Sequence, residues 1–215
     1  MNVKMSAWVH STFKVSAIDR LRIRTDGDGI RTLVLLRGCP LRCRYCINPF
    51  SWKEGKGYRE YTVQALYDKV CHDRPYFMAT GGGITFGGGE SLLQSEQIME
   101  FYLLCRDEFN LYAETSLHVP RENVEIAAKC VDQFYVDVKT LDGDIYRKYT
   151  GGSLNLVLEN LKYLLNTVGP SRVLVRIPLI PGYTGEGEQK RDKAYLEELG
   201  VARFDLFRYK DTTKK

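Results

Sequence analysis

Apolar stretches of strand length alternate along this chain with stretches of helical periodicity. The strand candidates are residues 31–38, 83–87, 111–115, 133–139, 172–179 and 203–209. Helical patterns lie between or after them at 62–71, 94–108, 120–129, 155–167 and 188–198. Val63, Leu66 and Val70 share one face of such a helix, which is the spacing of an amphipathic element. Near-continuous apolar strands separated by helices predict a parallel sheet with covered faces.

The number of strand–helix steps limits the architecture. Six steps in 215 residues predict an α/β fold with an incomplete (β/α)6 TIM-like barrel of parallel strands, because a full eight-stranded barrel needs about 250 residues. Before the barrel, LRIRTDGDGIRTLVLL alternates apolar and basic residues around a Gly-rich turn, as a short N-terminal hairpin does. We expect one domain over residues 1–215, with residues 1–24 as an N-terminal arm or hairpin.

Chemically capable residues follow the predicted strands where such folds carry their active sites, at the carboxyl ends. In chain order these residues are Cys39, Cys43 and Cys46, then Gly88, Gly89 and Glu90, then Glu114, then Asp137 and Lys139. Asp137 and Lys139 share one strand face because side chains alternate with a period of two. Pointing into a barrel, they need a partner or a ligand. Arg176 is predicted to point inward from the strand at 172–179.

Composition excludes several classes of protein. The net charge of +4 is too small to indicate nucleic-acid binding. The segment MNVKMSAWVHSTF lacks the apolar core of a secretory signal, and no run reaches the length of a membrane span. Six cysteines without a secretory context favour a cytoplasmic location and metal or redox chemistry. Seven arginines between Arg20 and Arg44 fit either a solvated face or a docking surface for an acidic partner or anionic cofactor.

Three of the cysteines are spaced C-x3-C-x2-C in the loop RGCPLRCRYCINP. A structural zinc site closes its shell with four ligands, so Cys71 or His72 would have to supply the fourth. Iron–sulfur clusters are held by thiolates on tight loops of this kind. A cubane held by three cysteines leaves one iron open for a substrate or cofactor. The spacing therefore favours an iron–sulfur cluster, with zinc as the alternative.

This cysteine loop, with Tyr45 before its last cysteine, resembles the signature of the radical S-adenosylmethionine (SAM) superfamily. DGDGIRTLVLLRGCPLRCRYCINP is similar to the opening motif of the glycyl-radical-enzyme activating enzymes, the family of pyruvate formate-lyase activase. GGGITFGGGESLLQ, YVDVKTLD and RIPLIPGYT resemble further motifs of that family. The resemblance runs in order from about residue 25 to residue 210.

The resemblance implies a radical SAM oxidoreductase with one [4Fe-4S] cluster, bound by Cys39, Cys43 and Cys46. SAM would bind the open iron, and its reductive cleavage would yield a 5′-deoxyadenosyl radical. That radical would take a hydrogen atom from a backbone glycine of a partner glycyl radical enzyme. The resemblance also implies a flavodoxin or ferredoxin as reductant. We expect a cytoplasmic monomer with no nucleic-acid or membrane partner.

The resemblance further assigns cofactor-binding residues. They are Tyr45, Cys46, Ile47, Gly88, Gly89, Glu90, Glu114, Asp137, Val138, Lys139, Arg176 and Lys210. Glu90 would accept bonds from the SAM ammonium, and Lys139 would meet its carboxylate or ribose. Glu114 and Asp137 would hold a monovalent cation, with an internal salt bridge as the alternative. Arg176 would orient SAM or the partner's loop, with a structural ion pair as the alternative.

The hairpin motif and the departures from the family pattern complete these expectations. Asp26 and Arg31 resemble positions that touch the incoming glycine loop, and Asp26 and Lys139 are the predicted catalytic residues. Ile47 and Lys210 stand where relatives usually carry histidines. The chain also stops earlier than many relatives, so we expect the open side of the barrel to be less covered.

Two other functions stay open. One is a short-barrel radical SAM enzyme that acts on a small molecule, and the other is an anaerobic ribonucleotide reductase activase. A non-enzymatic metal or electron-transfer module does not explain the Gly-Gly-Glu and Asp-x-Lys motifs. Cys105 and Cys130 fall on helical patterns and are predicted to be small buried apolar residues.

Overall fold

A single eight-stranded sheet forms the centre of the molecule, with the strand order β3-β1-β2-β4-β5-β6-β7-β8. The structure is a computed structural model that describes residues 11–54, 57–106 and 108–209. The strands are β1 (Thr12–Ile23), β2 (Ile30–Leu36), β3 (Arg59–Thr62), β4 (Gly83–Gly88), β5 (Asn110–Thr115), β6 (Gln133–Asp137), β7 (Val173–Leu179) and β8 (Arg203–Arg208). From β2 to β8 all neighbouring strands are parallel, which confirms the incomplete six-stranded barrel.

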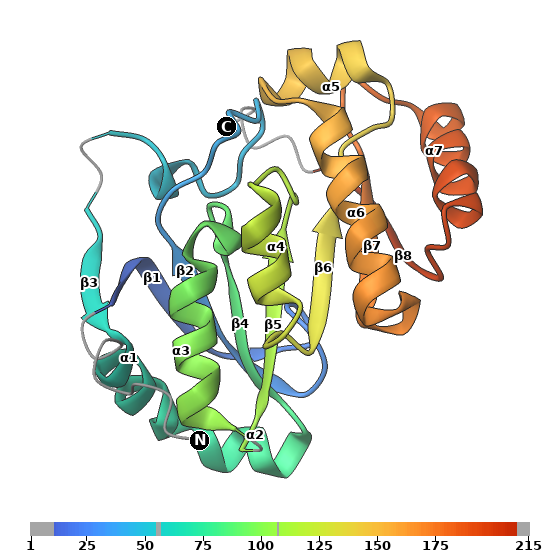
Figure 1. Cartoon of the computed structure of the whole chain (residues 1–215). Coiled ribbons are helices and arrows are strands. Elements are labelled where there is room, and N and C mark those ends of the chain that lie inside the picture. Colours follow the sequence, from blue (N-terminus) through green and yellow to red (C-terminus); the bar gives the residue numbers. More distant parts are fainter. Residues whose placement is uncertain (1–10, 55–56, 107, 210–215) are drawn as a thin grey trace.

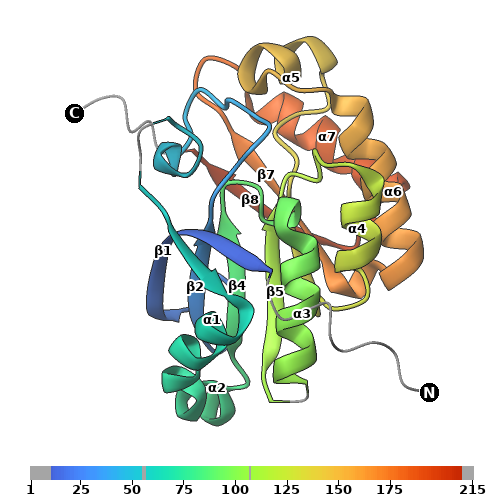
Figure 2. The same cartoon turned by 60° about the vertical axis from the view of Figure 1, so that its left-hand side comes forward.

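Seven α-helices accompany the described strands. They are α1 (Val63–Val70), α2 (Arg74–Thr80), α3 (Ser95–Cys105), α4 (Arg121–Ala127), α5 (Gly143–Thr150), α6 (Leu154–Val168) and α7 (Glu186–Glu198). Figures 1 and 2 show α3, α4 and α6 along one face of the sheet. The predicted helical patterns coincide with α1, α3, α4, α6 and α7. The patterns did not reveal α2 and α5, which have 7 and 8 residues.

The N-terminal hairpin is confirmed, although its first strand is longer than the pattern indicated. β1 pairs antiparallel with β2 and, through its first residues, antiparallel with β3. The turn at Gly27 has a φ of 133°, and a Cβ there would lie 2.5 Å from Cδ2 of Tyr112. Glycine is therefore required where the hairpin crosses the inner face of the sheet.

The two faces of the sheet differ in chemistry because side chains alternate along each strand. The outer positions are apolar and pack against helices; among them are Val34, Phe86, Ala113, Val136 and Val175. No described helix of the chain spans a membrane's thickness with the required apolarity. Many inner positions are polar or aromatic, with Leu33 and Leu35 among the apolar ones, so the concave face carries the chemistry.

Arg31, Thr85 and Tyr112 form the floor of this inner face. Arg31 is fully buried, and its guanidinium lies 3.5 Å from the ring centroid of Tyr112. It donates hydrogen bonds to Thr85 Oγ1 (2.7 Å) and to the Ile84 carbonyl (2.6 Å). Burial lowers the pKa of Arg31 to about 10, so the side chain is still charged at neutral pH.

Candidate active site

The cysteine loop leaves the carboxyl end of β2 and is anchored on the end of α5. The backbone N–H groups of Arg42 and Arg44 donate to the carbonyls of Thr150 (2.7 Å) and Tyr149 (3.1 Å). These carbonyls belong to the last turn of α5, where helix carbonyls lack internal partners. The backbone of Gly38 also donates to the Ser51 carbonyl at 2.8 Å, which closes the loop. Backbone bonds therefore anchor the loop, and they leave its cysteine side chains available for chemistry.

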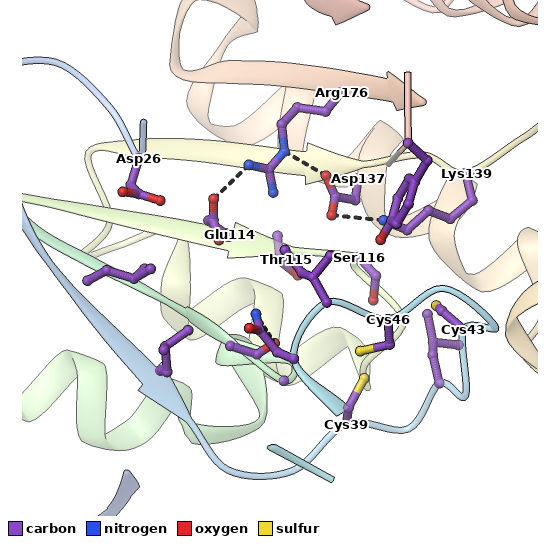
Figure 3. A pocket seen from close by; sticks show the side chains of 18 of the residues that line it. Asp26, Cys39, Cys43, Cys46, Glu114, Thr115, Ser116, Asp137, Lys139 and Arg176 are labelled. Carbon is purple, nitrogen blue, oxygen red and sulfur yellow. Dashed lines mark hydrogen bonds and ion pairs between the residues drawn. The ribbon is translucent and has the colours of Figure 1, made fainter. Parts of the chain in front are cut away.

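Cys39, Cys43 and Cys46 line a cavity of about 640 Å³ at this end of the sheet, as Figure 3 shows. All three are free thiols and are half-buried. Burial raises the pKa of the Cys39 thiol to about 12 and raises that of Cys43 as well. Binding of a metal centre must therefore displace protons from these thiols.

The donor set fits a cubane cluster. Among the described residues, no three His, Cys, Asp or Glu side chains converge on a point that could hold one metal ion. A cubane cluster needs cysteine sulfurs that are farther apart than the ligands of a single ion, because each thiolate binds a different iron. Cys71 and His72, the candidate fourth zinc ligands, lie between α1 and α2 at the bottom of Figure 1, whereas the blue cysteine loop lies at the top. Nothing in this arrangement supports the zinc alternative. Cys105 and Cys130 are buried, as predicted.

The Gly-Gly-Glu turn lies directly against the end of β2. Gly88 has a φ of 96°, and a Cβ on Gly89 would overlap the carbonyl oxygen of Gly38. The N–H groups of Gly89 and Glu90 donate to the carbonyls of Leu36 (3.1 Å) and Gly38 (2.7 Å). Gly88 and Gly89 line the cavity. Both glycines therefore allow the backbone to approach the cysteine loop closely.

Glu90 itself does not line the cavity. It is 1% exposed, and its carboxylate accepts hydrogen bonds from Thr115 Oγ1 (2.6 Å), Ser116 Oγ (2.6 Å) and the Ser116 N–H (2.8 Å). Burial raises its pKa, which the hydrogen bonds oppose. Thr115 and Ser116 line the cavity in its place. The predicted contact of Glu90 with an ammonium group stays a prediction. The sequence patterns did not reveal Thr115 and Ser116 as lining residues, although Thr115 ends a predicted strand and Ser116 follows it.

An ion-pair network forms the wall opposite the cysteines, as Figure 3 shows. Arg176 bonds Glu114 Oε1 and Asp137 Oδ1, each at 2.6 Å. Lys139 Nζ bonds Asp137 Oδ2 at 2.9 Å. Burial opposes ionisation, yet the charges of Arg176 and Lys139 lower the pKa of Asp137 to about 2. Asp137 also raises the pKa of Lys139 against the effect of burial, so both are charged at neutral pH.

This network does not fit the predicted monovalent cation. Arg176 occupies the space between the two carboxylates of Glu114 and Asp137. A cation held by both would have to displace the guanidinium. The internal ion pairs that were the alternative describe the arrangement found.

The hairpin motif places Asp26 at the cavity and Arg31 beneath it. Asp26 lines the cavity and accepts bonds from Arg22 Nε (2.6 Å) and Thr25 Oγ1 (2.6 Å). Thr85 Oγ1, which accepts from Arg31, donates to the Asp26 carbonyl at 2.8 Å. Because Arg31 is fully buried, it supports the turn and does not face an incoming loop.

The remaining predicted cofactor residues differ in their placement. Ile47 lines the cavity and is 66% exposed. The Tyr45 hydroxyl donates to the Pro181 carbonyl at 3.3 Å, and Tyr45 does not line the cavity. Val138 is fully buried, and its N–H donates to the Arg176 carbonyl. Lys210 lies outside the described residues. Four further residues line the cavity without belonging to a distinctive sequence motif: Asn48, Trp52, Phe207 and Tyr209.

Comparisons with known proteins agree with the fold. Residues 33–191 match the radical SAM superfamily. The chain therefore belongs to that superfamily, whose members use a 4Fe-4S cluster and SAM. The SAM-bound structure of SuiB from Streptococcus suis superposes with a TM-score of 0.63 at 16% identity, covering 82% of this chain and 39% of the SuiB chain. At that identity the likeness concerns the fold.

Closer relatives define the family within the superfamily. The pyruvate formate-lyase-activating enzyme of Clostridium pasteurianum is 37% identical over 171 residues, 80% of this chain and 71% of the relative. The pyruvate formate-lyase 1-activating enzyme of Escherichia coli K12 is 31% identical over 184 residues, 81% and 74% of the two chains. This chain belongs to the family of pyruvate formate-lyase-activating enzymes.

Proposed function

We propose that this protein activates a glycyl radical enzyme of the pyruvate formate-lyase type by removing a hydrogen atom from one backbone glycine. The observation that carries the proposal is a single cavity shared by three free thiols, the Gly88–Gly89 turn and a charged lysine. When bound, the cluster and SAM supply the electron transfer and the radical that takes the hydrogen. A cavity of about 640 Å³ has the size of a small-molecule site.

The protein's own residues bind and orient the cofactors. Cys39, Cys43 and Cys46 would hold the cluster, and the backbone at Gly88 and Gly89 would contact the amino-acid part of SAM. Lys139 is 6% exposed and lines the cavity, and Asp137 fixes its ammonium at 2.9 Å. A fixed positive charge there suits the SAM carboxylate.

The partner's glycine must reach the same cavity from outside. Asp26 on the hairpin side and Asp205 and Phe207 on β8 also line it, so the cavity extends between the two flanks of the incomplete barrel. We assign the opening between these two flanks, with Asp26 at its edge, to the partner's glycine loop. The remaining proposals are a flavodoxin or ferredoxin as reductant, a monomeric state, one radical SAM domain over residues 1–215 and a cytoplasmic location.

Anaerobic reconstitution tests the proposal. The protein is loaded with iron and sulfide, reduced with SAM present, and mixed with a pyruvate formate-lyase. We expect 5′-deoxyadenosine together with a glycyl doublet in the electron paramagnetic resonance (EPR) spectrum. Cys39→Ala, Cys43→Ala and Cys46→Ala should each abolish both products, whereas Cys130→Ala, a buried cysteine outside the loop, should retain them.

Two outcomes count against the proposal. Intact SAM beside a fully loaded, reduced cluster would exclude radical SAM chemistry. Formation of 5′-deoxyadenosine without a glycyl signal in any glycyl radical enzyme would favour the small-molecule alternative.

A further inference from the structure

The indole of Trp52 hydrogen-bonds one of the three cysteines of the loop. Its Nε1 lies 3.4 Å from Cys46 Sγ, and an indole nitrogen can only donate. Trp52 lines the cavity beside Cys46. The bond is therefore an N–H···S contact to a sulfur that the family uses as an iron ligand.

Two cationic side chains of the loop lie over the ring of this indole. The guanidinium of Arg42 lies 4.7 Å from the ring centroid, and its Nη1 donates to the carbonyls of Cys39 (2.6 Å) and Leu41 (2.8 Å). Lys53 lies 5.9 Å from the same centroid. Cations over an aromatic face are attracted to its π-electrons and draw electron density from the ring. The indole N–H thereby becomes a stronger donor.

We propose that Trp52, held by Arg42, raises the reduction potential of the cluster through its hydrogen bond to Cys46. Reduction adds one negative charge, part of which resides on the ligating sulfurs. A donor to sulfur stabilises the reduced cluster more than the oxidised one, and such bonds are among the factors that set cluster potentials. The inference rests on the proposed function, which requires the cluster. It concerns how readily a reductant can reduce that cluster.

The test removes the N–H and keeps the ring. Trp52→Phe and a variant with 3-benzothienylalanine at position 52 both lack the donor, and the second preserves the size of the indole. Arg42→Gln removes the cation over the ring. Ser51→Ala is the matched control, because it removes a hydroxyl donor from the same loop that bonds the Asn48 carbonyl and no sulfur.

Iron and sulfide content are measured first, and the midpoint potential of the cluster is then measured by EPR-monitored titration. For both Trp52 variants we expect roughly a tenfold smaller equilibrium constant for one-electron reduction, a midpoint about 59 mV lower. Arg42→Gln should shift the midpoint in the same direction by less, and Ser51→Ala should not shift it. SAM cleavage by the Trp52 variants should slow with a flavodoxin and recover with a stronger reductant.

Each other outcome has a defined meaning. Loaded Trp52 variants with the wild-type midpoint would overturn the proposal. Loss of iron from the benzothienylalanine variant would show that the N–H serves ligation by Cys46 and would also overturn it. A wild-type protein that binds no cluster would contradict the proposed function, and this inference with it.

Discussion

The ion-pair network offers a direct test of how the inner face is stabilised. Arg176→Met removes the guanidinium that joins Glu114 to Asp137 and keeps an unbranched side chain of similar length. Both carboxylates then lose a partner that lay 2.6 Å away, while Asp137 keeps Lys139. We expect the variant to fold with a smaller free energy of unfolding.

The size of this loss follows from burial. Removing one partner of a buried ion pair costs about 3–5 kcal/mol. Here the side chains of Arg176, Glu114 and Asp137 are 18%, 19% and 25% exposed, so solvent screens part of the loss. We expect a decrease of about 2–3 kcal/mol at neutral pH.

The same argument gives the pH dependence of the loss. Burial already raises the pKa of Glu114, and Arg176 opposes that rise. Without Arg176 the pKa of Glu114 rises further. When the pKa of a carboxyl group is higher in the folded than in the unfolded state, its ionisation destabilises the folded protein. This destabilisation is present only at pH values above the pKa of the unfolded state. The loss should therefore be smaller at about pH 4 than at about pH 7.

Urea unfolding under anaerobic, reducing conditions measures both quantities. Glu114→Gln in the Arg176→Met background removes one of the two deprived carboxylates and should recover about 1 kcal/mol. The reasoning is refuted if Arg176→Met is as stable as wild type at neutral pH. Equal losses at the two pH values, or no recovery in the double variant, would show that Glu114 is not the group that Arg176 stabilises.

Three further predictions concern other parts of the inner face. Gly27→Ala should lower stability by roughly 2–3 kcal/mol in thermal unfolding, because φ is 133° and the new Cβ meets Tyr112; an unchanged melting temperature would contradict the hairpin geometry. Glu90→Gln places an amide N–H against the Ser116 donors and should cost about 2 kcal/mol in urea unfolding; no loss would mean that Ser116 is held otherwise. The pKa of Asp137 in the folded protein is about 2, so its ionised form stabilises the fold by about 2 kcal/mol above the unfolded-state pKa, and this stabilisation is lost as the pH falls toward 2. Asp137→Asn should therefore make the free energy of unfolding depend less on pH in the acid range.

The sequence determined the elements that local periodicity encodes. Near-continuous apolar runs separated by helical patterns predicted the six parallel strands. The cysteine loop, the Gly-Gly turn and Lys139 were predicted at the carboxyl ends of these strands, because every parallel strand ends at the same edge. Periodicity also predicted that Asp137 and Arg176 face inward, since a strand has only two faces. These features depend on neighbours within a few residues, so one sequence suffices to find them.

The tertiary structure alone decided the partners of these inward residues. Asp137 meets Arg176 because β6 and β7 pair in a register that places the two side by side, and no local pattern fixes a register between strands 39 residues apart. Glu90 bonds Ser116 because a carboxylate is tolerated in a buried position only when several hydrogen-bond donors satisfy it. Those donors come from the end of another strand. The contact of Trp52 with Cys46 likewise depends on how the loop closes on α5, which the spacing of its cysteines does not specify.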